Sequence, residues 1–111
     1  MTITVNQIAQ LIEGTIRVNL KSLTKYEEKY ENKTDSITNT IKQVLIGPNT
    51  VKLRVTVDGE NVINGSYKEN ETNITAPMSG VGTVEIKLYI NDVLKSTKQV
   101  NLKNQTEVVF E

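Results

Sequence analysis

Carboxylates are the side chains of this chain best suited to acid–base catalysis or metal binding, because its 111 residues include no histidine and no cysteine. Histidine is the usual proton carrier at neutral pH, and histidine or cysteine completes the usual nucleophilic triads. The carboxylate pairs closest in sequence are Glu27 with Glu31, Asp58 with Glu60, and Glu69 with Glu71. All lie in polar stretches typical of loops and turns, so the sequence predicts no catalytic residue and a protein that is not an enzyme.

The segment Asp58-Gly59-Glu60-Asn61 offers oxygen atoms that could bind calcium, but it lacks the alternating ligand spacing of a loop such as an EF-hand. A tight turn is the better interpretation. Gly80 and Gly82 do not follow the strand-to-helix pattern of a phosphate-binding loop. We therefore expect no metal site and no cofactor.

The charge balance bears on the class of partner. Lysine plus arginine and aspartate plus glutamate both number 13, which gives a formal net charge of zero. A nucleic-acid-binding protein usually carries a basic excess, so none is expected as a partner. No apolar run is long enough to cross a bilayer, and no secretory leader opens the sequence. We expect a location in the cytoplasm or in a virion assembled there, or outside the cell if the sequence is an excised domain.

The length predicts a single domain, residues 1–111. Apolar residues at helical spacing, with Gly14 as the end signal, predict a short helix over 4–13. Alternation predicts a strand over 15–20, and the charged segment 21–36 is a polar loop or a helical turn. Residues 37–46 fit either a helix by spacing or a strand by their threonine and β-branched content, and the strand is favoured.

Strict alternation of apolar and polar residues dominates the C-terminal half, so that 37–111 is predicted to be rich in strands. The clearest case is 83–102, where two extended segments flank the turn signal Asn91-Asp92. Strands are also expected at 50–57, 61–67, 71–76 (closed by Pro77) and 107–110. The segments TVKLRVTVDG (50–59) and TVEIKLYIND (83–92) align 33 residues apart, through either duplication or convergence on one hairpin pattern.

The rhythm Thr72-Asn73-Ile74-Thr75-Ala76-Pro77, followed by the alternating residues 82–88, resembles small bacterial and phage immunoglobulin-like or fibronectin-III-like domains. The resemblance covers about half of the chain, and the core tryptophan and cysteine pair of antibody domains are absent. It implies a mainly β, antiparallel immunoglobulin-like β-sandwich and loosely a role in adhesion or assembly. The short N-terminal helix predicted from spacing is not typical of such domains.

The sequence thus favours a non-enzymatic structural or adhesive protein, a component of a phage virion or bacterial surface assembly, that binds protein partners or itself. The alternatives are a carbohydrate-binding module, with Tyr89 as the platform, and a small cytosolic regulator encoded by a phage. The expected interaction face combines the polar positions of two strands: Lys52, Arg54, Thr56, Glu85, Lys87 and Tyr89. If these strands pair, opposite charges could meet across them.

Overall fold

The computed structural model describes residues 11–111, of which 61% lie in strands and 4% in helix. The prediction of a mainly β protein with antiparallel sheets is confirmed. The elements are β1 (Ile12–Val18), α1 (Leu20–Leu23), β2 (Tyr30–Thr34), β3 (Ile41–Leu45), β4 (Thr50–Val57), β5 (Glu60–Lys68), β6 (Ile74–Gly80), β7 (Thr83–Ile90), β8 (Val93–Asn101) and β9 (Glu107–Phe110).

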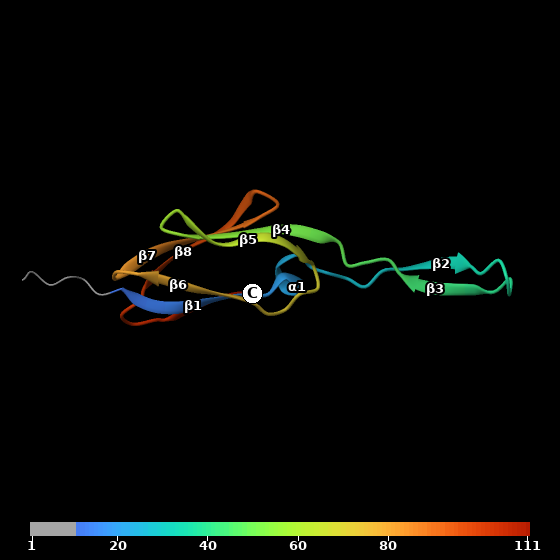
Figure 1. Cartoon of the computed structure of the whole chain (residues 1–111), viewed down its shortest axis with the longest axis horizontal. Helices are drawn as coiled ribbons and strands as arrows, with labels where there is room; N and C mark the ends of the chain where they lie inside the picture. The colour runs from blue at the N-terminus through green and yellow to red at the C-terminus, as the bar shows by residue number, and fades with distance from the viewer. Residues whose placement is uncertain (1–10) are drawn as a thin grey trace, which may run out of the picture.

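Seven strands form two sheets, which together with α1 we call the body (Figure 1). One sheet has the order β5-β4-β7-β8 and is antiparallel throughout. The other has the order β6-β1-β9, in which β1 is antiparallel to β6 and parallel to β9. The inner faces of both sheets contribute to one hydrophobic core.

The alternation in the sequence explains why the sheets face each other. In β4, Val51, Leu53, Val55 and Val57 are each at most 5% exposed, because successive side chains of a strand point to opposite faces. The same alternation buries every second residue of β7, β6 and β9. All nineteen buried hydrophobic residues among 11–111 belong to the body or to the loop before β9.

The hairpins β4–β5 and β7–β8 are related by an approximate two-fold axis through the Val55–Leu88 pair. At the first turn, Asp58 N–H donates to the Glu85 carbonyl (2.9 Å), and Asp58 Oδ1 accepts from Glu85 N–H (2.8 Å). At the second turn, 33 residues later, Asn91 makes the equivalent bonds with Lys52 (2.8 and 3.0 Å). Both turns have two residues at positive φ, as type I′ hairpins require.

The symmetry extends well beyond the ten aligned residues. A register shift follows Val55 in one hairpin and Leu88 in the other. Equivalent backbone bonds also follow each hairpin. Glu69 N–H donates to the Asn49 carbonyl after the first hairpin, and Leu102 N–H donates to the Gly82 carbonyl after the second, both at 2.9 Å. In the same way, Glu71 N–H donates to the Lys68 carbonyl and Asn104 N–H to the Asn101 carbonyl, both at 3.0 Å. The repeat suggested by the sequence is therefore a repeat of structure across residues 49–104.

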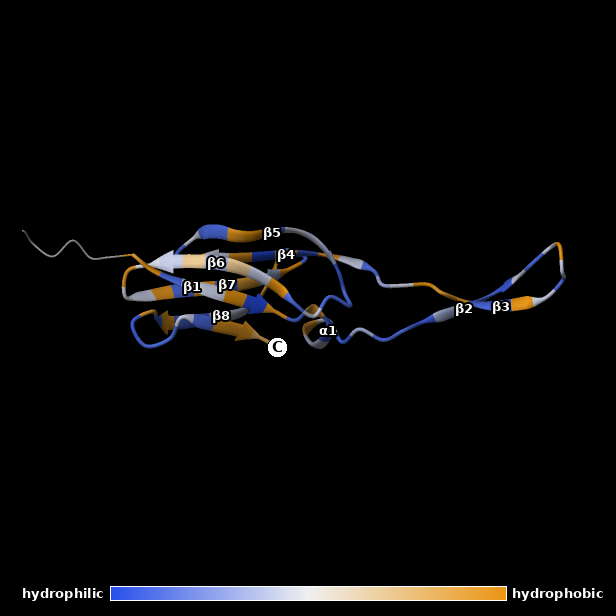
Figure 2. Cartoon of the chain, turned by 60° about the horizontal axis from the view of Figure 1, so that its bottom comes forward, coloured by the Kyte–Doolittle hydropathy of each residue, from blue (hydrophilic) through white to orange (hydrophobic). Residues whose placement is uncertain are grey.

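The remaining two strands, β2 and β3, form a separate two-stranded sheet that extends from one end of the body (Figures 1 and 2). We call this hairpin, residues 30–45, the arm. Its ladder runs from the Tyr30–Leu45 pair at the base to the Thr34–Ile41 pair near the tip. The arm is inserted between α1 and β4, so both of its ends return to the same end of the body.

The predicted helix over 4–13 falls largely outside the described residues, but its last part is wrong. Ile12 and Glu13 lie in β1, and Gly14 is inside that strand rather than at a helix end. A Cβ on Gly14 would lie 2.5 Å from the Thr106 carbonyl oxygen. This glycine therefore permits close approach of the loop before β9, a constraint between distant segments that helical spacing could not reveal.

Other boundaries also differ from the prediction. The strand expected over 15–20 ends at Val18, because Asn19 caps α1 by accepting a bond from Ser22 N–H at 3.3 Å. The segment 21–36 contains part of this helical turn but also the unpredicted strand β2. Pro77 does not close β6, which continues to Gly80. In 37–46 the favoured strand interpretation is confirmed for Ile41–Leu45 (β3), and the residues before them form a turn.

Candidate functional site

The predicted interaction face lies on the outer side of the β4–β7 pair, on the sheet surface away from the core. The structure brings its residues together: Arg54 is opposite Tyr89, and Thr56 is opposite Lys87. Lys52 and Glu85 lie at opposite ends of this antiparallel pair, so their charges do not meet across the strands. Instead, Lys52 pairs with Asp92 (3.8 Å), and Glu85 pairs with Lys87 of its own strand (3.3 Å).

The centre of this face is already occupied by its own side chains. The Arg54 guanidinium lies 4.1 Å from the centroid of the Tyr89 ring, a cation–π contact that covers one face of the ring. Thr56 is only 6% exposed. Arg54 and Tyr89 therefore pack against each other, and the ring face of Tyr89 that Arg54 covers is not open to a sugar.

The arm has the opposite character, because every residue of β2 and β3 is exposed. The two strands pair with each other and with no other strand among residues 11–111. Five large apolar or aromatic side chains are nevertheless found in it, and Figure 2 shows orange, hydrophobic segments on β3 and at the tip. They are Tyr30, Ile37, Ile41, Val44 and Leu45, with exposed fractions between 38% and 93%.

The alternation of the two paired strands separates the arm into two different faces. One face carries three register pairs without a charge: Tyr30 with Leu45, Asn32 with Gln43, and Thr34 with Ile41. The other face carries Glu31 opposite Val44, and Lys33 directly opposite Lys42. We call the first the uncharged face. In a protein that is 23% charged residues, such a face is the kind of surface that a partner can cover.

The turn at the tip is held in a defined shape by local hydrogen bonds. Asp35 N–H donates to the Thr40 carbonyl (2.8 Å), and Ile37 N–H donates to Asp35 Oδ1 (2.9 Å). Asn39, at φ 53°, allows the chain to reverse. This turn leaves Ile37 93% exposed at the apex, where a polar residue would be expected in a loop that meets only water.

Backbone hydrogen bonds extend the arm ladder beyond β2 and β3 and tie the helix that precedes the arm to the body. Ile46 N–H donates to the Lys29 carbonyl (2.9 Å) and so continues the arm ladder toward the body. On the body side, Leu20 N–H donates to the Glu71 carbonyl (2.9 Å), which ties α1 to the loop between β5 and β6. Leu20 is fully buried in the core. The arm therefore begins from a helix that is itself part of the folded body.

Tyr30 at the base of the arm donates a hydrogen bond from its hydroxyl to Glu28 Oε2 (2.9 Å). This bond, and then the negative charge of Glu28, raise the pKa of Tyr30 above its usual value. The phenol therefore ionises only at a higher pH than a free tyrosine.

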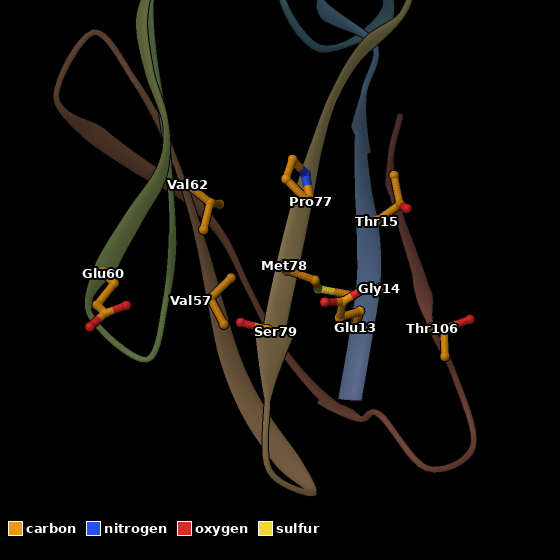
Figure 3. Close-up of a pocket in the computed structure, with 10 residues that line it drawn as sticks. All are labelled: Glu13, Gly14, Thr15, Val57, Glu60, Val62, Pro77, Met78, Ser79 and Thr106. Carbon is orange, nitrogen blue, oxygen red and sulfur yellow. The ribbon is translucent and has the colours of Figure 1, made fainter. Parts of the chain in front are cut away.

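A pocket of about 550 Å³ lies at the other end of the body, where β1 begins and the β4–β5 turn is located (Figure 3). Its apolar lining comes from Val57, Val62, Pro77 and Met78. Its charged lining consists of two carboxylates, Glu13 and Glu60, with no lysine or arginine. Neither carboxylate forms an ion pair with any residue of 11–111.

Within the described range, no three histidine, cysteine, aspartate or glutamate side chains come together in a way that could hold a metal ion. The helix of this range is too short to span a membrane.

Reasoning from the sequence missed the arm as a functional element, since its residues were treated as a polar loop and an ambiguous segment. A signal was present, however. Ile37, Ile41 and Leu45 occur in a segment flanked by charged and polar residues, without the repeated alternation that marks a buried face. Apolar residues outside the alternating pattern were the indication of an exposed contact surface.

Comparisons with known proteins give no relative from which function could be transferred. No protein-family model matches the chain, no curated protein matches it, and no solved structure matches it.

Proposed function

We propose that this chain is a non-enzymatic assembly protein that binds another protein surface through the arm. The observation that carries the proposal is the uncharged face with Ile37 beside it at the tip: apolar side chains on an ordered hairpin that no other strand among residues 11–111 covers. A structural component of a virion or of a bacterial surface assembly would use such an arm to hold neighbouring subunits.

The stability expected of an isolated hairpin supports this proposal. A two-stranded hairpin is marginal in water, and like charges directly opposite each other, such as Lys33 and Lys42, destabilise it further. A partner that covers the uncharged face removes apolar surface from water and stabilises the pairing of β2 with β3. The arm therefore gains most of its stability when it is bound.

The strand order of the body also supports an immunoglobulin-like sandwich as the scaffold. The order β5-β4-β7-β8 corresponds to the C′-C-F-G order of variable-type domains, and β6 beside β1 corresponds to E beside B. β9 takes the place of strand A beside B, but it is parallel to β1, which is a departure from that pattern. By this analogy the arm is an insertion in the B–C connection, at the end of the domain where antibodies bind their ligands.

The test is site-specific photo-cross-linking in cells of the source organism. A photoreactive residue replaces Ile37, which is 93% exposed at the tip, and the matched control carries it at Thr97, an exposed position on the body. We expect a discrete covalent adduct with one protein from position 37 and little from position 97. Equal yields from both positions, or no adduct from position 37, would overturn the proposal.

A further inference from the structure

The surfaces at the two ends of the molecule complement each other. The arm leaves one end of the body and continues along its long axis in both views, and the pocket with Glu13 and Glu60 lies at the opposite end (Figures 1, 2 and 3). From the position of the pocket, the charges of the arm and its exposed apolar residues, we infer that the arm binds the pocket of a second copy of this chain. The inference rests on the proposed function and names its partner.

Charge complementarity is the first argument for this occupant. Lys33 and Lys42 stand directly opposite each other on the arm, and neither has an ion-pair partner among residues 11–111. The pocket offers two carboxylates and no basic side chain. Two lysines meeting two carboxylates relieve the repulsion on each side, and such complementary charges also orient the encounter of two chains.

The apolar residues provide the second argument. Ile37, 93% exposed, lies in the tip turn next to the two lysines, and Ile41, 70% exposed, lies at the same end of the arm but on its uncharged face. The pocket has an apolar lining that includes Val62 and Met78, next to its carboxylates. The complementary charges are thus Lys33 and Lys42 on the arm, which also carries Glu31 and Asp35, and the two carboxylates of the pocket. The net charge of zero leaves no overall repulsion between copies.

Buried area argues against the simplest alternative, in which two arms pack face to face. A strand of five residues is about 17 Å long, so two arm faces in contact would bury only a few hundred Å², roughly a third of what a stable interface needs. The proposed contact instead joins the arm to the end of a body. Because the joined surfaces differ, the contact is heterologous, and it can repeat from copy to copy.

The experiment uses two charge-reversed full-length variants. K33E/K42E changes the arm and leaves the pocket intact, and E13K/E60K changes the pocket and leaves the arm intact. The solution mass of each is measured by sedimentation velocity over a concentration series, alone and in an equimolar mixture. Circular dichroism confirms that both variants keep the fold of the wild-type chain.

We expect the wild-type mass to grow with concentration beyond that of two chains. Each variant alone should associate at least about tenfold more weakly, since a buried charge pair now repels. The mixture should associate again, because the intact arm of one variant meets the intact pocket of the other, and the two charge-reversed surfaces also attract each other.

Three results would overturn the inference: a wild-type chain that stays monomeric at every concentration, an E13K/E60K variant that associates as the wild type does, or a mixture that forms no complex. The second result would assign the contact to arm–arm pairing. The proposed function is tested separately by the cross-link at position 37. A cross-link from position 37 to a different protein would support binding through the arm and would contradict only the inference that the partner is a second copy of this chain.

Discussion

The body and the arm are built from similar strands, but they place their apolar residues in opposite environments. In β4 and β7 every second residue is buried between two sheets, with Leu53, Ile86 and Leu88 fully inaccessible. In β2 and β3 alternation produces two faces, and neither meets another sheet within residues 11–111. The difference shows that alternation alone does not define a core strand. A second layer must cover the apolar face, and in the arm we propose that this layer comes from another chain.

The largest expected effect separates the contributions of body and arm to stability. Leu53→Ala leaves a cavity in the core and should lower the free energy of unfolding by about 2–5 kcal/mol. Ile41→Ala removes a side chain that is 70% exposed in the free chain, and it should change that free energy by less than about 0.5 kcal/mol. Urea denaturation of dilute protein measures both values. Similar losses for the two variants would mean that the arm belongs to the folded core.

The next prediction concerns the close packing within the body. In Gly14→Ala the new Cβ would lie 2.5 Å from the Thr106 carbonyl oxygen, a backbone atom that cannot move away cheaply. We expect a loss of about 1–3 kcal/mol. The matched control is Gly65→Ala, where the nearest atom is a Tyr67 ring carbon at 3.4 Å. This strand position should gain up to about 1 kcal/mol, and an equal loss at both glycines would contradict the account.

The internal symmetry of the body makes a third, smaller prediction. Asp58→Ala and Asn91→Ala each remove a side-chain oxygen that accepts a backbone N–H bond, and each places alanine at positive φ. Both changes should cost about 1–2 kcal/mol. The two thermal unfolding curves should shift by similar amounts. A loss confined to one variant would show that the two turns contribute unequally to stability, although their geometry is equivalent.

The smallest effect is expected in the arm. Because Glu28 raises the pKa of Tyr30, Glu28→Gln should lower that pKa toward the usual tyrosine value. The stabilisation from this bond is complete below the tyrosine pKa of the unfolded chain, and it is lost as the pH rises through the higher pKa of the folded chain. An NMR titration of the tyrosine Cζ resonances resolves Tyr30 from the other three tyrosines. An unchanged Tyr30 titration would indicate that the bond does not persist in solution.

The sequence predicted the central strands of the body well because β4 and β7 are amphipathic over full alternating runs. The run 83–90 and the turn Asn91-Asp92 needed no long-range information. Gly14 was misassigned because its role depends on Thr106, 92 residues away. The order of the strands within each sheet, including the parallel β1–β9 pair, also follows from tertiary packing rather than from local pattern.

The candidate site was predicted only in part. The six residues of the predicted interaction face do share one surface, but Arg54 and Tyr89 contact each other instead of remaining accessible to a partner. The arm was missed because a hairpin that lacks a covering layer has little alternation of buried and exposed positions to detect. Its two faces can be distinguished only from the register of β2 and β3, which places Lys33 opposite Lys42 and separates the uncharged face from the charged one.

Hydrogen–deuterium exchange of the dilute, monomeric chain tests most directly the claim that the body is stable alone and the arm is not. The account predicts that amides paired between β2 and β3 exchange orders of magnitude faster than those paired between β4 and β7, since opening free energies differ widely within one protein. The arm amides should become protected when a partner is bound. Arm amides as protected as those of β4 in the free monomer would contradict the account.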